Sequence, residues 1–196
     1  MKKITTYLLG FFCFGLLIGS CQAPLSQSTE KTAVKDSSWQ NQMEATLPLL
    51  GHRNWILIVD KAYPTPSSAN VTIINTAQDL SEVVQQMDSL LKIQDHIRPI
   101  VYQDEELANI DEQLVPGVDT FKKEIGTIFG SDIHVIPHAS VFKKIDDASK
   151  LFNIVILKTA SVLPYTSLFI ELDCKYWDAD KEQELRHRIL KNRNKK

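Results

Sequence analysis

The chain has 196 residues, of which 43% are hydrophobic, and a formal net charge of −2 at pH 7. This length predicts one domain with short extensions, and this composition is ordinary for a globular protein. The small net charge and the lack of interleaved aromatic and basic residues argue against nucleic acid as a partner.

Residues 1–20 have the layout of a secretory signal peptide. Lys2 and Lys3 give a positive start, residues 7–18 are almost wholly apolar, and small residues follow. The apolar run is shorter than the roughly 20 residues that span a bilayer, which favours a signal peptide. A plain transmembrane anchor and soluble secretion are the alternatives.

Cys21 directly follows Ile18-Gly19-Ser20, and this order resembles the processing box of bacterial lipoproteins. In that class the cysteine is the lipidated first residue of the mature chain. Several acyl chains anchor a protein more firmly than one does. The resemblance implies a protein that is anchored to a membrane and faces the periplasm. Gln22, where an aspartate would favour inner-membrane retention, favours the outer membrane.

Residues 21–37 are polar and show no periodicity, which predicts a flexible tether between the membrane and a folded domain. Cys13 lies in the signal peptide and Cys21 is the expected lipidation site. Cys174 is then the one cysteine left, so no disulfide is expected within the chain.

From residue 38 onwards, helix-like and strand-like segments alternate. A helix that ends at Gly51 is predicted by the spacing of Trp39, Met43, Leu47 and Leu50. Apolar runs between turn residues predict strands at 55–59, 71–74, 99–102, 133–136, 153–157 and 168–172. Apolar stripes predict helices that begin near residues 79, 116 and 140.

This alternation predicts an α/β fold, with a single layered domain over residues 38–175 and a central sheet flanked by helices. Residues 176–196 are strongly charged and are predicted to form a helical, solvated extension.

The sequence has no G-x-S-x-G elbow, phosphate-binding glycine loop or H-E-x-x-H motif. His134 and His138 are four residues apart, but they span a predicted strand and turn, so no metal site is expected.

Four polar residues stand at the ends of predicted strands, where α/β sheets gather ligands: His52, Asp60, His138 and Tyr165. Each also has a structural explanation, as a helix stop, a turn cap, a helix cap or a corner residue.

Three motifs resemble the signatures of the D-ribose pyranase and L-fucose mutarotase family (RbsD/FucU). GHRNWILIVDKAYP at 51–64 resembles an opening signature of Gly-His, an apolar strand and Asp-Ala-x-x-Pro. IHVIPHASVFK at 133–143 resembles a segment in which a histidine precedes a helix. LKTASVLPYTSLFI at 157–170 resembles the closing Arg-Thr-Gly-Glu-x-x-Pro-Tyr-Ala-Asn and its apolar strand. The likeness extends over residues 38–173.

The resemblance implies a homo-oligomeric ring that binds a monosaccharide and opens its hemiacetal by acid–base chemistry, without metal or cofactor. The catalytic residues that it implies are His52 and Asp60. The substrate-binding residues that it implies are His138, Tyr165, Ser167 and Lys158. Histidine suits proton transfer near neutral pH because its free pKa is about 6.5.

The chain departs from these signatures at several positions. Lys61 replaces the alanine of the opening motif, and Lys158 replaces the closing arginine. Ala160 and Ser161 stand where the family has Gly-Glu, and Ser167 replaces the asparagine. Two functions are therefore open: a lipid-anchored mutarotase or pyranase, and a non-catalytic sugar-binding or assembly module with the same fold.

Replacing Cys21 by alanine should release the protein from the membrane fraction, because the change removes the acylated thiol. Fractionation of cells that express the wild type and Cys21→Ala checks this prediction. A variant that still sediments with membranes would contradict the lipoprotein hypothesis.

Overall fold

The computed structural model describes residues 38–194. The predicted signal peptide, the lipidation site at Cys21 and the tether lie outside these residues. No helix within the described range is long and apolar enough to cross a membrane.

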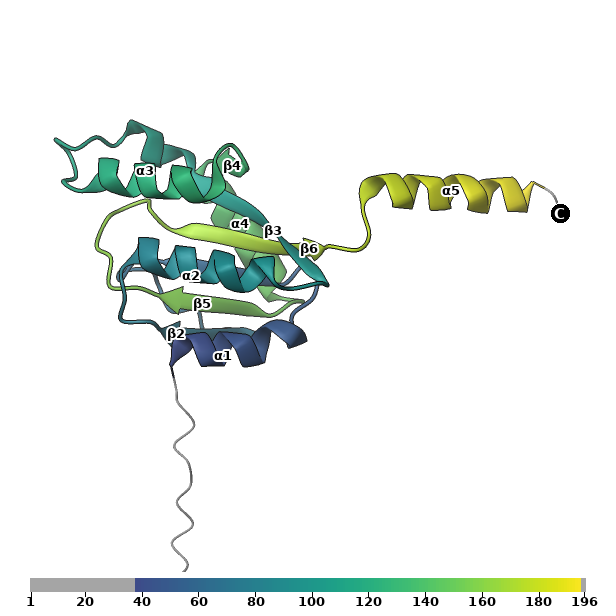
Figure 1. The fold of residues 1–196 in the computed structure, drawn as a ribbon, viewed down its shortest axis with the longest axis horizontal. Helices are drawn as coiled ribbons and strands as arrows, with labels where there is room; N and C mark the ends of the chain where they lie inside the picture. Colours follow the sequence, from purple (N-terminus) through teal and green to yellow (C-terminus); the bar gives the residue numbers. More distant parts are fainter. Residues whose placement is uncertain (1–37, 195–196) are drawn as a thin grey trace, which may run out of the picture. The chain divides into compact units, whose positions relative to one another are not determined.

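A six-stranded sheet in the order β2–β5–β1–β6–β3–β4 forms the centre of the fold (Figure 1). The strands are β1 (Trp55–Val59), β2 (Val71–Asn75), β3 (Ile97–Asp104), β4 (Ile133–Ile136), β5 (Ile154–Lys158) and β6 (Leu168–Cys174). β1 and β2 pair parallel with β5, and β3 pairs parallel with β4. β6 pairs antiparallel with both β1 and β3.

The ends of the strands form two opposite edges of the sheet, and the reversal of β6 decides which loops meet at each of them. The amino end of β6 lies at the same edge as the carboxyl ends of the other five strands. We call this the carboxyl edge. The loops that follow β1 to β5 and the loop that precedes β6 therefore all meet there.

Helices cover both faces of the sheet, which confirms the predicted α/β fold. α1 (Trp39–Thr46), α2 (Leu80–Lys92) and α3 (Val118–Phe129) pack on one face, and α4 (His138–Ser149) packs on the other. Short 3-10 helices follow α1 and β3, as η1 (Leu47–Leu49) and η2 (Glu105–Asn109). α5 (Ala179–Arg193) follows β6, and none of its residues is buried.

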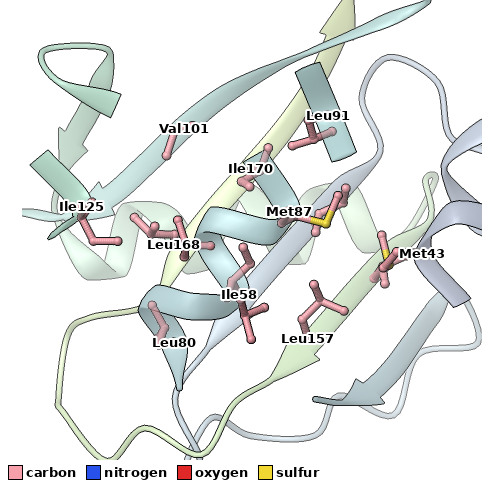
Figure 2. Close-up of a cluster of buried hydrophobic side chains, with 14 of the residues drawn as sticks. Met43, Ile58, Leu80, Met87, Leu91, Val101, Ile125, Leu157, Leu168 and Ile170 are labelled. Carbon is pink, nitrogen blue, oxygen red and sulfur yellow. The ribbon is translucent and has the colours of Figure 1, made fainter. Parts of the chain in front are cut away.

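The larger apolar cluster lies between the sheet and the three helices α1, α2 and α3 (Figure 2). α2 contributes a stripe at helical spacing, made of Leu80, Val83, Val84, Met87 and Leu91. β1 and β5 supply Ile58 and Leu157 from the sheet. Helices cover both faces of these two strands, which explains their continuous apolar runs instead of an alternating pattern.

Three of the differences from the predicted element boundaries bear on the core and the site. α1 ends at Thr46 and passes into η1, because Pro48 has no backbone N–H and restricts the residue before it. β3 continues to Asp104, and α4 begins at His138 instead of near Ser140. The last two shifts bring two ionisable side chains to the carboxyl edge.

Ile58→Ala should destabilise the fold by about 2–5 kcal/mol, because it leaves a cavity beneath α2. The matched control is Ile93→Ala, since Ile58 is 0% exposed and Ile93 is 76% exposed. The control should stay within about 0.5 kcal/mol of the wild type. Urea denaturation measures both variants, and equal losses would contradict the described core.

Candidate active site at the carboxyl edge

The carboxyl edge gathers five of the six site residues that the sequence predicts. Asp60 follows β1, Lys158 ends β5 and His138 begins α4 directly after β4. Tyr165 and Ser167 lie in the loop that precedes β6. The fold thus brings together residues that are more than a hundred positions apart in the sequence.

A buried carboxylate contacts the imidazole of His138. Asp104, the last residue of β3, is 1% exposed, and its Oδ2 lies 2.8 Å from Nδ1 of His138. An ionised carboxylate can only accept, so with Asp104 ionised and the imidazole neutral, Nδ1 donates its hydrogen and Nε2 keeps a free lone pair. The contact therefore holds His138 in the tautomer that can accept a proton at Nε2.

Burial raises the pKa of Asp104 above its ordinary value. The hydrogen bond and charge of His138 lower this pKa, whereas the carboxylates of Glu106 and Asp60 raise it. The second oxygen, Oδ1, is buried and has no hydrogen-bond partner among the described residues. The ionised carboxylate is thus costly to bury, and perturbed groups of this kind cluster at functional sites.

His138 is also fixed through its backbone and the faces of its ring. Its backbone N–H points at both carboxylate oxygens of Glu106, at 3.1 and 3.2 Å. This carboxylate sits at the start of α4, where the helix dipole favours negative charge. The ring packs on Phe142 and meets Tyr165 edge-on, with centroid distances of 4.6 and 5.2 Å.

Tyr165 adopts a left-handed backbone conformation with φ of 58°. A side chain with a β-carbon rarely takes this conformation, and such strain is typical of functional sites. The phenol ring stays exposed while its edge contacts the His138 ring. Tyr165 therefore offers both a hydroxyl and an aromatic surface beside the imidazole.

Asp60 is held by its own turn and by the closing loop. One carboxylate oxygen accepts from the Ala62 N–H at 2.8 Å, and the other accepts from the Ser167 hydroxyl at 3.2 Å. The backbone N–H of Asp60 donates to the same hydroxyl oxygen at 3.4 Å. Ser167 is 4% exposed. It therefore positions Asp60 in this structure, whereas the sequence predicts a direct ligand.

Lys158 lines a pocket at the ends of β2 and β5. Its Nζ donates to the backbone oxygen of Tyr63 at 2.9 Å. The pocket has a volume of about 490 Å³ and is lined by Lys61, Asn75, Ala77, Lys158, Thr159 and Ala160. Burial, followed by the charges of Asp146, Asp104 and Asp60, raises the pKa of Tyr63, so its phenol stays protonated at neutral pH.

His52 lies at the opposite edge of the sheet. It precedes β1, whereas Asp60 follows β1, and five strand residues at about 3.3 Å each separate the two ends by roughly 17 Å. The neighbouring Arg53 N–H donates to the Leu172 oxygen, near the carboxyl end of β6. The two residues implied as catalytic, His52 and Asp60, therefore do not meet within one chain.

Two residues that sequence reasoning missed complete the arrangement, namely Asp104 and Glu106. The predicted third strand ends at residue 102, so both carboxylates fall in the acidic run that follows it. The rule that found Asp60, a polar residue directly after a strand, would have found Asp104 with the strand end placed correctly. The residues described here include no group of three or more His, Cys, Asp or Glu side chains that could hold a metal ion.

No protein-family model and no curated protein matches the chain. Among solved structures, it is similar to Bacillus subtilis RbsD complexed with D-ribose, with 17% identity and a TM-score of 0.48 over 67% of this chain and 91% of that chain. It is also similar to the fucose mutarotase from Streptococcus pneumoniae in complex with L-fucose, with 15% identity and a TM-score of 0.47 over 67% of this chain and 91% of that chain. For FucU from Bifidobacterium longum the identity is 13% and the TM-score is 0.44, over 68% of this chain and 94% of that chain.

The chain resembles the RbsD/FucU family, as its motifs predict. At these identities and TM-scores, the similarity assigns neither a substrate nor an activity to the chain.

Asp104→Asn should stabilise the fold at pH 8, because it removes a buried charge and keeps an oxygen that accepts from Nδ1 of His138. The raised pKa means that protonation of Asp104 stabilises the folded state. That stabilisation is fully present below about pH 4 and is lost as the pH rises through the folded-state pKa.

The difference in Tm between Asp104→Asn and the wild type should therefore be positive at pH 8 and vanish below about pH 4. Each 1 kcal/mol gained raises Tm by about 2–4 °C in a domain of this size. Asp132→Asn, an exposed change, is the control. A variant that is less stable than the wild type at both pH values would contradict the described environment of Asp104.

Proposed function

We propose that the protein is a monosaccharide mutarotase or pyranase-like enzyme that acts on a pentose or hexose by acid–base ring opening. The observation that carries this proposal is the 2.8 Å contact between buried Asp104 and His138, next to Tyr165. Asp60 lies at the same edge of the sheet. A proton acceptor, a carboxylate for hydroxyl groups and an aromatic surface are the groups that such chemistry needs.

The reaction needs one proton acceptor and one proton donor. Nε2 of His138 takes the proton of the anomeric hydroxyl, the bond between the anomeric carbon and the ring oxygen breaks, and its electron pair moves to the ring oxygen. A second group protonates that oxygen. The open carbonyl form then closes on its other face, or through another hydroxyl, with both proton transfers reversed.

His52 from a neighbouring copy is the second proton-transfer group in this proposal. It is exposed and lies about a strand length from Asp60 of its own chain, so only another copy can bring it to the carboxyl edge. A head-to-tail interface joins different edges of successive copies, and it forms a ring when the rotation between copies closes. The proposal therefore requires a homo-oligomer, with each site shared between two chains.

The proposed enzyme is held by a lipid on Cys21 at a periplasm-facing membrane, with the outer membrane favoured. Asp60 and Tyr165 bind sugar hydroxyls beside His138. Ser167 acts indirectly, because its hydroxyl is engaged by Asp60.

The second candidate function is a sugar-binding or assembly module without catalysis. The observation in its favour is the closed contact between Asp60 and Ser167, in a loop that lacks the family's Gly-Glu pair and asparagine. Such a module would bind sugars at the same edge and leave the rate of anomer exchange unchanged.

Exchange NMR and saturation-transfer NMR with a panel of pentoses and hexoses test the two functions together. The enzyme should bind at least one sugar and accelerate its anomer exchange, and His138→Ala should remove about 100- to 10,000-fold of that acceleration. Binding without any accelerated exchange would leave the module as the function.

Mixing two inactive variants tests the shared site. His52→Ala and His138→Ala should each lose the accelerated exchange alone, because each removes a proton-transfer group from every site. Co-refolded in equal amounts, they should regain about a quarter of the wild-type exchange rate, since about one interface in four joins two intact halves. Mixed samples that stay as inactive as the single variants would contradict a site built from two copies.

A further inference from the structure

We propose that the sugar carries an anionic group, a carboxylate or a phosphate, which binds between Lys61 and Lys158. This inference rests on the proposed function and adds the substrate class. The pocket at the ends of β2 and β5 is lined by these two lysines and otherwise by Asn75, Ala77, Thr159 and Ala160. None of the lining residues is acidic, so two positive charges share one cavity.

Neither lysine forms a salt bridge within the described residues. The ammonium group of Lys158 donates one hydrogen to the Tyr63 oxygen at 2.9 Å and has two further donors. That bond holds the long side chain in place before a ligand arrives. The nearest carboxylate in the sequence, that of Asp60, already accepts from Ala62 and Ser167.

Backbone contacts fix the residues that line the pocket. Asn75 and Lys158, which both line it, are paired in the parallel ladder at the ends of β2 and β5. The Lys61 N–H donates to the Ser161 oxygen at 2.8 Å, which ties the loop after β1 to the loop after β5. The Ala160 N–H donates to the backbone oxygen of Gln78 at 2.7 Å, which joins the loop after β5 to the loop after β2. The two lysines are thus placed by backbone contacts on each side.

The pocket and the proton-transfer residues share the carboxyl edge. Neighbouring strands lie about 4.8 Å apart, so the pocket at β5 is one strand from Asp60 at the end of β1. That spacing matches the width of one sugar ring, with its hydroxyls at Asp60 and its charged group at the lysines.

Saturation-transfer NMR on the lipid-free chain tests the inference with matched sugar pairs: D-glucuronate against D-glucose, and D-glucose 6-phosphate against D-glucose. At low salt, the anionic member of at least one pair should bind on the order of tenfold more tightly than its neutral partner. Raising the ionic strength from about 0.01 M to about 1 M shortens the Debye length from about 30 Å to about 3 Å and should reduce this ratio. The uronate and phosphate pairs distinguish the two sources of negative charge.

Lys61→Ala should bring the ratio towards one, and Lys61→Glu should invert it. Lys123→Ala, an exposed change on α3, is the control and should keep the wild-type ratio. Equal binding of anionic and neutral sugars by the wild type, or a ratio that Lys61→Glu leaves intact, would overturn the inference.

The outcome is separable from that of the proposed function. An anionic sugar that binds through Lys61 without accelerated anomer exchange upholds this inference and contradicts the enzyme. Accelerated exchange of neutral sugars alone upholds the enzyme and contradicts this inference. If acetate or inorganic phosphate fully displaces the anionic sugar, the lysine pocket is supported as the part of the site that binds the negative charge.

Discussion

β6 runs against both of its neighbours, β1 and β3, and this reversal decides which side chains can meet at each edge of the sheet. Its amino end joins the carboxyl ends of the five other strands, so the loop with Tyr165 and Ser167 reaches Asp60 and His138. If β6 were parallel to its neighbours, that loop would lie at the opposite edge of the sheet and could not contact Asp60 or His138. His52 stays about a strand length away from Asp60 because β1 itself lies between the two residues.

The site depends on a carboxylate that the fold buries at a cost. Asp104 ends a strand between two apolar layers, and burial is the first cause of its raised pKa. The cost is offset locally by the His138 imidazole, whose backbone is fixed in turn by Glu106. A buried acceptor with one unpaired oxygen stabilises no fold by itself. We therefore infer that the contact between Asp104 and His138 fixes the tautomer and the orientation of the imidazole ring.

The spacing of apolar residues in the sequence is enough to predict most of the helices and strands, and polar residues at predicted strand ends indicate most of the site. The run Trp55–Val59 and the stripe on α2 are set by local burial patterns, so the sequence is sufficient to predict them. Strand order and direction arise from long-range pairing, which leaves no local signal. For that reason the sequence could not show that His52 and Asp60 lie at opposite edges of the sheet, and it overlooked Asp104, two residues beyond a predicted strand end.

Proton acceptance at the carboxyl edge requires that His138 carries its hydrogen on Nδ1 in the folded protein. Long-range ¹H–¹⁵N NMR of the imidazole at pH 8 reports directly which nitrogen carries the hydrogen. The wild type should show the hydrogen on Nδ1 and a bare Nε2, and Asp104→Ala should shift the population towards Nε2–H because the acceptor is lost. A wild-type ring protonated at Nε2, and unchanged in Asp104→Ala, would contradict a proton-accepting site at the carboxyl edge.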